Sequence, residues 1–154
     1  MSALTLTDLL NSPGLDLGAS RWFDIDQPRI DAFAQLTEDL QWIHVDPVRS
    51  ADGPFGRTIA HGYLTMSLVA PVLNELFIDR VSDAAASINY GANKVRFPAA
   101  VPVDSRLRGR ATLVSVERVT GGVQANLLVT MEIEGQEKPA CVAELLIRLR
   151  GVER

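Results

Sequence analysis

Apolar and polar residues alternate along several stretches in the second half of the chain. Residues 123–133 carry an apolar side chain at every odd position, and residues 141–149 repeat this phase. A period of two collects the apolar side chains on one face, so both stretches predict strands with one buried face. Residues 106–111 also alternate, but the phase shifts at Leu113–Val114, which predicts a bulge or a bend.

A fourth strand and two turns complete this pattern. Ser87 to Phe97 predicts a strand that is closed by Pro98. The segments Gly121-Gly122 and Glu134-Gly135-Gln136 separate neighbouring strands and predict hairpin turns. The second half of the chain therefore predicts about four long antiparallel strands.

Helical patterns dominate the first half of the chain. Leu4–Leu10 predicts a short helix and Arg21–Ile25 a short strand. Asp26 suits a helix N-cap with Pro28 in the first turn, and the apolar stripe that follows predicts a helix ending near Thr37.

A second helix is predicted over Ile59–Phe77, which is apolar on nearly every side and is therefore expected to be buried. Pro71 lies inside this segment and predicts a kink or a break, because proline supplies no N–H to the helix. Burying such a helix needs a sheet around it. The chain is therefore expected to form one α+β domain over residues 1–154, with a curved antiparallel sheet around the helix.

Composition and charge exclude several classes of protein. A net charge of −4 disfavours a surface that binds nucleic acid, because phosphate contacts require clustered positive charge. The longest apolar stretch is interrupted by polar residues and is too short for a membrane span. Cys141 is the single cysteine, so no disulfide framework is expected. With no signal-peptide pattern at the start, we expect a cytoplasmic location.

Asp39 and His44 are the first candidates for chemistry, since they share one short segment directly after a predicted helix. A carboxylate and an imidazole held close together can activate a shared water and return its proton to a substrate. The same spacing also fits a turn-capping aspartate beside a packed histidine. Spacing alone leaves both interpretations open.

Three ordered motifs carry a family resemblance. They are residues Thr37 to Pro47, the segment Pro54-Phe-Gly-Arg-Thr-Ile-Ala-His-Gly-Tyr-Leu64, and the stretch from Asn89 to Val103 with its Val-Arg-Phe and Val-Pro-Val elements. Together they resemble the MaoC-like dehydratases, also called R-specific enoyl-CoA hydratases, and the subgroup that includes nodulation protein N-like members. The resemblance implies the hot-dog fold, in which a long central helix is wrapped by a curved antiparallel sheet, and a homodimer.

The resemblance also implies roles for particular residues. Asp39 and His44 become the pair that activates water for addition to the double bond of an enoyl-CoA or an enoyl-acyl-carrier thioester. Gly62 becomes the N–H donor to the thioester oxygen, a role that its place at a helix start suits. Gln41 and His61 are expected near the substrate, although His61 fits a bond to nearby backbone better. No metal or other cofactor is implied.

The candidate contacts to the CoA phosphates are Lys94 and Arg96; exposed strand charges would explain them equally well.

The catalytic loop departs from the family pattern. Glu38, Gln41 and Trp42 occupy positions where the family commonly has Gly, Asn and Pro, and Ala70 replaces a serine found in some members. These changes leave the acid–base pair intact, but they affect the shape of the pocket.

Three other functions fit parts of the sequence. A hot-dog thioesterase would need an acidic residue on the central helix, where only Glu75 is present, near the far end. A binding protein without turnover would explain the altered loop but not the intact Asp39 and His44. An iron site could use the pattern His44-x-Asp46 with His61, although the first pair lacks the expected strand context.

Overall fold

A curved antiparallel sheet is the dominant element of the computed structural model, which describes residues 3–151; in that range the sheet has six strands. Its four long strands, which confirm the prediction from alternation, are β3 (Ala84–Arg96), β4 (Ser105–Val119), β5 (Gly122–Ile133) and β6 (Cys141–Gly151). The long strands lie in the order β4-β5-β6-β3. Two short strands, β1 (Leu15–Ala19) and β2 (Phe23–Ile25), both pair with β4.

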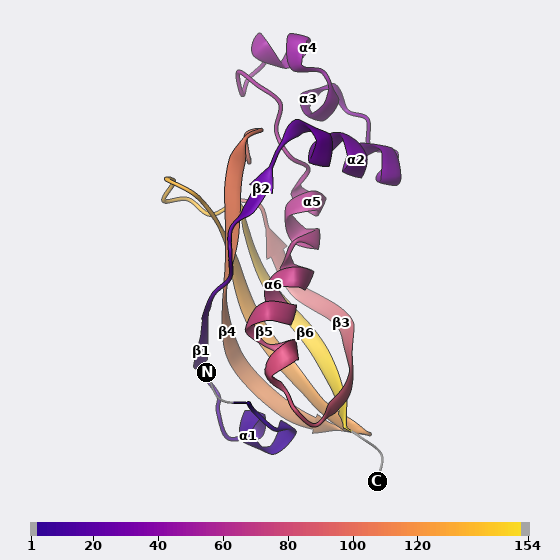
Figure 1. Cartoon of the computed structure of the whole chain (residues 1–154), viewed down its shortest axis with the longest axis vertical. Coiled ribbons are helices and arrows are strands. Elements are labelled where there is room, and N and C mark those ends of the chain that lie inside the picture. Colours follow the sequence, from indigo (N-terminus) through magenta and orange to yellow (C-terminus); the bar gives the residue numbers. More distant parts are fainter. Residues whose placement is uncertain (1–2, 152–154) are drawn as a thin grey trace.

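The strand pattern produces a single buried face. The odd-numbered residues of β5, and those of β6 from Cys141 to Leu149, are buried, while their even-numbered neighbours are at least partly exposed. In the register between these strands, Leu127 lies opposite Leu145, so apolar residues meet on the inner face. The predicted bulge in β4 is confirmed, because the register with β5 slips between Leu113 and Ser115. Figure 1 shows the sheet curving around the helices that pack on its concave side.

Strand β1 was not predicted. Its sequence Leu15-Asp-Leu-Gly-Ala offers only a brief alternation, and Gly18 has a φ of 86°. The pairing with β4 slips between Asp16 and Gly18, which is the irregularity expected where a glycine interrupts a strand. The strand is therefore stabilised by its long neighbour rather than by a local pattern.

The central helix is divided in two. Helix α5 (Gly62–Ser67) is followed at Leu68 by helix α6 (Val69–Leu76), and a 3-10 turn, η1 (Ile78–Arg80), ends this part of the chain. The break predicted from Pro71 is confirmed: proline has no N–H to donate to the carbonyl four residues earlier, where α5 ends. The predicted helix start at Ile59 was wrong by three residues.

That start is displaced because residues 58–61 are extended and bonded to another segment. The Ala60 N–H donates to the Val101 carbonyl at 2.8 Å, and the Val103 N–H donates to the Thr58 carbonyl at 2.9 Å. We call residues 58–61 the return segment. It leads the chain from the outlying helices back to the sheet and places Gly62 as the first residue of α5.

Three short helices lie together beyond the end of the sheet, close to the start of α5 (Figure 1). They are α2 (Gln27–Thr37), α3 (Trp42–Val45) and α4 (Pro47–Ala51), and we call residues 26–57 the overhang. Asp26 caps α2 as predicted, since its carboxylate accepts from the Arg29 N–H at 3.0 Å. At the other end of the molecule, α1 (Leu6–Leu10) confirms the predicted N-terminal helix. Across residues 3–151, no helix is long and apolar enough to cross a membrane.

Helix α6 lies very close to the sheet at Gly109 of β4. A methyl group on this residue would lie 2.4 Å from Cγ1 of Val72, whose side chain is fully buried. Only glycine allows α6 to lie this close to the strand.

Gly109→Ala is therefore expected to lower the free energy of unfolding by about 1–3 kcal/mol, because the core cannot accommodate the added methyl. The measurement is the midpoint of urea unfolding. Gly91→Ala is the matched control, since nothing lies within 4 Å of the position of its added carbon. Equal stabilities for the two variants would contradict the close contact.

Candidate active site

The turn after α2 presents Asp39 at the surface. Helix α2 ends at Thr37, and Glu38 adopts the left-handed conformation, with a φ of 61° and a ψ of 17°. Glycine is the residue that favours this conformation, which explains why the family commonly has glycine here. Glu38 keeps the turn that glycine would form, so the first departure in the loop preserves the backbone path. The side chain of Asp39 follows directly and is exposed.

His44 is buried in α3, with 7% of its surface exposed. Its Nδ1 lies 2.6 Å from the carbonyl oxygen of Ile59, and the Ile59 N–H donates to the Ile43 carbonyl at 3.0 Å. A carbonyl can only accept, so Nδ1 carries the hydrogen and the neutral ring leaves Nε2 unprotonated. The return segment therefore sets the tautomer that a general base needs.

Gln27 holds the backbone of His44, a role that the sequence analysis missed. Its side-chain amide donates to the His44 carbonyl at 2.8 Å and to the Asp31 carboxylate at 2.7 Å. The hydroxyl of buried Thr58 donates to the Gln27 side-chain carbonyl at 2.5 Å. Residue 27 opens α2 and has no motif around it, so only the folded structure reveals that it connects α2, α3 and the return segment.

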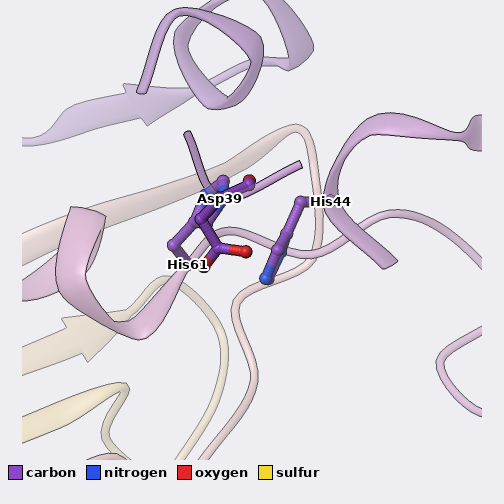
Figure 2. A group of neighbouring side chains, drawn as sticks. All are labelled: Asp39, His44 and His61. Atoms are coloured by element: carbon purple, nitrogen blue, oxygen red, sulfur yellow. The ribbon is translucent and has the colours of Figure 1, made fainter. Parts of the chain in front are cut away.

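His61 lies against His44. The two rings are stacked, with centroids 3.7 Å apart and planes inclined by 26°. One carboxylate oxygen of Asp39 and one ring nitrogen each of His44 and His61 lie within 4.8 Å of one another. Figure 2 shows the Asp39 carboxylate pointing toward the nitrogen-bearing end of the His44 ring. The pair that was identified from the sequence is thus brought together, with the second histidine beside it.

The three side chains supply one carboxylate oxygen and two ring nitrogens, a set of donors that could hold a metal ion. One nitrogen of each ring is bonded to a backbone carbonyl, that of Ile59 for His44 and that of Asp39 for His61. Asp46, the carboxylate in the iron-site interpretation, caps α4 by accepting from the Arg49 N–H at 2.9 Å. The arrangement suits proton transfer through a shared water.

Burial lowers the pKa of His44 below its ordinary value of 6.5. The loss of hydration is the largest cause and disfavours the charged ring. The hydrogen bond to Ile59 and the charge of Asp39 act in the opposite direction, while His61 adds to the lowering. His44 is therefore neutral at pH 7, with Nε2 free to accept a proton.

Gly62 lies at the start of α5, beneath the ring of Phe97. A methyl group on Gly62 would lie 3.2 Å from carbon atoms of that ring. The first N–H groups of a helix have no partner within the helix, so this end supplies donors for a developing negative charge. A side chain here would press on the Phe97 ring, so a residue without one suits this position.

The remaining predicted residues are more dispersed. Gln41 is exposed at the N-cap of α3 and makes no capping bond with its side chain. Lys94 and Arg96 line a hollow on the sheet together with Glu144, and the lining of this hollow includes neither Asp39 nor His44. The role of these cations in binding CoA stays a prediction.

Two departures from the family pattern have visible structural roles. The Trp42 ring packs on Gly53, where an added methyl would lie 3.0 Å from ring atoms, and Arg49 stacks on the ring at 4.4 Å. Trp42 thus ties α3 to α4 within the overhang. Ala70 lines a groove of about 360 Å³ between the central helices and β3.

A central helix held in a curved antiparallel sheet defines a hot-dog protein, and the carboxylate–imidazole pair above its start defines a candidate acid–base enzyme. The MaoC like domain matches residues 8–133, so the chain belongs to the MaoC-like dehydratase family. The resemblance stated from the motifs is therefore confirmed.

The relatives span nearly the whole chain. It is 48% identical over 145 residues to 3-hydroxyacyl-thioester dehydratase Z of Mycobacterium tuberculosis, with 94% of this chain and 95% of that protein covered. It is 41% identical over 145 residues to Nodulation protein N of Rhizobium leguminosarum bv. viciae, with 93% and 89% covered.

Solved structures share the fold at lower sequence identity. An (R)-hydratase from A. caviae involved in PHA biosynthesis aligns with a TM-score of 0.74 at 23% identity, over 90% of this chain and 96% of that chain. A monoamine oxidase regulatory protein from Archaeoglobus aligns with a TM-score of 0.81 at 17% identity, over 99% and 98%. These likenesses establish the hot-dog architecture.

The lowered pKa of His44 leads to a pH prediction. The ring signals of His44 in an NMR titration should move with a midpoint below 6.5, and Asp39→Asn should lower that midpoint further by removing a charge that raises it. The same shift means that the folded state loses stability as the pH falls below 6.5, because the unfolded chain binds the proton more readily. A midpoint at or above 6.5 would contradict the burial argument.

Proposed function

We propose that the protein catalyses the reversible addition of water to a trans-2-enoyl thioester, giving an (R)-3-hydroxyacyl thioester. The single observation that carries this proposal is the placement of the Asp39 carboxylate beside the ring of His44, whose Nδ1 is bonded to the Ile59 carbonyl. The relatives support it, since one is a 3-hydroxyacyl-thioester dehydratase and a structural neighbour is an (R)-hydratase.

In the hydration direction, a water molecule lies between Asp39 and His44. Asp39 accepts one hydrogen bond from it, while Nε2 of His44 removes the other proton as the water oxygen attacks C3. The electron pair of the double bond moves toward C1, and the thioester oxygen becomes negative. The N–H of Gly62 stabilises that oxygen. His44 then returns the proton to C2, so that a C–O and a C–H bond form and the enzyme is regenerated.

The groove beside the central helices supports an acyl substrate. It is lined by side chains of α5, α6, β3 and β6, among them Tyr63, Met66, Ala70, Leu73 and Leu145. Tyr63 directly follows Gly62, so the groove begins next to the proposed site of the thioester oxygen. We propose that the acyl group is carried by coenzyme A or by an acyl-carrier protein. We also propose that the protein acts in the cytoplasm, as expected from the sequence.

The thioesterase alternative lacks its acid. Glu75 lies on α6, one residue before its end, and accepts from the Arg21 N–H at 2.9 Å. It also lies 4.0 Å from the Arg21 guanidinium. The Glu75 carboxylate is therefore bonded to Arg21, just before β2. This contact is separate from the one between His44 and His61.

Asp39→Asn and His44→Gln should each reduce the rate of hydration by about 100-fold or more, the usual contribution of a general acid or base. The measurement is the loss of enoyl absorbance with crotonyl-CoA and longer enoyl-CoAs, with chiral analysis of the product. Asp52→Asn is the matched control, because Asp52 is an exposed carboxylate in the loop after α4. Near-normal turnover in either catalytic variant would overturn the mechanism.

We also propose that two copies pair through β3. This strand is 13 residues long, forms an edge of the sheet, and contains no buried residue. An edge of this length with free N–H and carbonyl groups is a template for another strand. Exposed Tyr63 and Phe97 lie beside it, at 74% and 42% exposure, and a second copy would cover them together with the groove.

Sedimentation at micromolar concentration should therefore give the mass of a dimer. Gly91→Asp should weaken the dimer, because a two-fold axis perpendicular to β3 and close to the middle of the strand, where Gly91 lies, brings the two new charges toward each other. Gly91→Ala adds a side chain without charge and should leave the dimer intact. A monomeric wild-type protein would contradict the proposal.

A further inference from the structure

His61 touches both proposed catalytic residues, although it was singled out from the sequence only as a neighbour of Gly62. Its ring is 2% exposed, and its Nε2 lies 3.0 Å from the backbone carbonyl oxygen of Asp39, 22 residues away in the sequence. The same ring stacks on His44. One imidazole therefore contacts the backbone that carries the carboxylate and the ring that carries the base.

The hydrogen bond to Asp39 determines the tautomer of His61. A carbonyl oxygen only accepts, so Nε2 carries the hydrogen and Nδ1 of the neutral ring is bare. Nδ1 is buried and has no hydrogen-bond partner among residues 3–151. The opposite tautomer would bury an unpaired N–H there and set a lone pair against the Asp39 carbonyl, which is the costlier arrangement. His44 and His61 thus hold opposite tautomers in one stack.

Asp39 depends on this bond for its position. Its side chain is exposed, and it follows a residue in the left-handed conformation. Within the part of the chain that the structure describes, the contact with His61 is the hydrogen bond that ties Asp39 to a distant segment. Without it, the turn after α2 would be free to move away from the His44 ring.

We propose that His61 is a positioning residue, which in its Nε2-protonated form holds the Asp39 turn and the His44 ring at the separation that activates water. The proposal rests on the proposed hydration. In it His61 does not contact the substrate, so the loss of His61 lowers kcat rather than raising KM. A displacement of about 1 Å in such a pair is enough to cost large factors in rate.

Two substitutions separate this role from general packing. The amide nitrogen of glutamine can occupy the place of Nε2 and donate to the Asp39 carbonyl, whereas asparagine is one methylene shorter and cannot reach it. His61→Asn should lower kcat for crotonyl-CoA at least about tenfold with little change in KM. His61→Gln should stay within about threefold of the wild type in kcat. Equal kcat values for the two variants, or a loss confined to KM, would overturn the proposal.

A second measurement does not depend on activity. The chain contains only two histidines, so nitrogen-15 NMR of the ring nitrogens shows two ring systems, which the His61→Gln variant assigns. His61 should show a protonated Nε2 and a bare Nδ1, and His44 the reverse. The backbone order parameters at Asp39 and Leu40 should fall in His61→Asn and hold in His61→Gln.

The two readouts distinguish the possible failures. A wild-type protein that hydrates no enoyl thioester, yet shows these tautomers and this loosening of the turn, would refute the proposed function alone. A protonated Nδ1 on His61, or a turn equally ordered in both variants, would refute the positioning role.

Discussion

The hydrogen bond between His44 Nδ1 and the Ile59 carbonyl connects the two parts of the molecule on which the proposed chemistry depends. Ile59 belongs to the return segment, and its neighbours Thr58 and Ala60 bond to residues 101–103 beside the sheet. The bond therefore fixes α3 relative to the sheet and leaves Nε2 as the basic atom. Burial lowers the pKa of His44 and so keeps its ring neutral near pH 7, which a general base requires.

The hydrophobic pattern was sufficient to predict β5 and β6, since each of them buries one face and shows a clear period of two. Strand β3 contains no buried residue, and its end was marked by Pro98. The same pattern located the central helix and its break at Pro71. It placed the helix start at Ile59, because an extended apolar segment that pairs with residues 101–103 has the same composition as a buried helix. Strand β1 escaped prediction because its stability comes from β4, a neighbour far away in the sequence.

The candidate site was only partly predictable. Asp39 and His44 lie on one segment, so their proximity follows from the sequence once a family resemblance selects them from many such pairs. The bonds that hold them come from Gln27, Ile59 and His61, and these join segments that are 15 to 22 residues apart. No local spacing encodes such contacts. The departures at Glu38 and Trp42 are explained only by the folded structure, in which Glu38 forms a left-handed turn and Trp42 packs on Gly53.

The buried thiol of Cys141 has a consequence for a protein that handles thioesters. Cys141 is fully buried on the inner face of β6, and burial raises its pKa to about 11. The thiolate is the form that attacks thioesters and disulfides, and it is almost absent at neutral pH. The fold thereby keeps the chain's own sulfur from accepting acyl groups or forming mixed disulfides with free coenzyme A. The protein can therefore meet reactive thioesters repeatedly without acylation of Cys141.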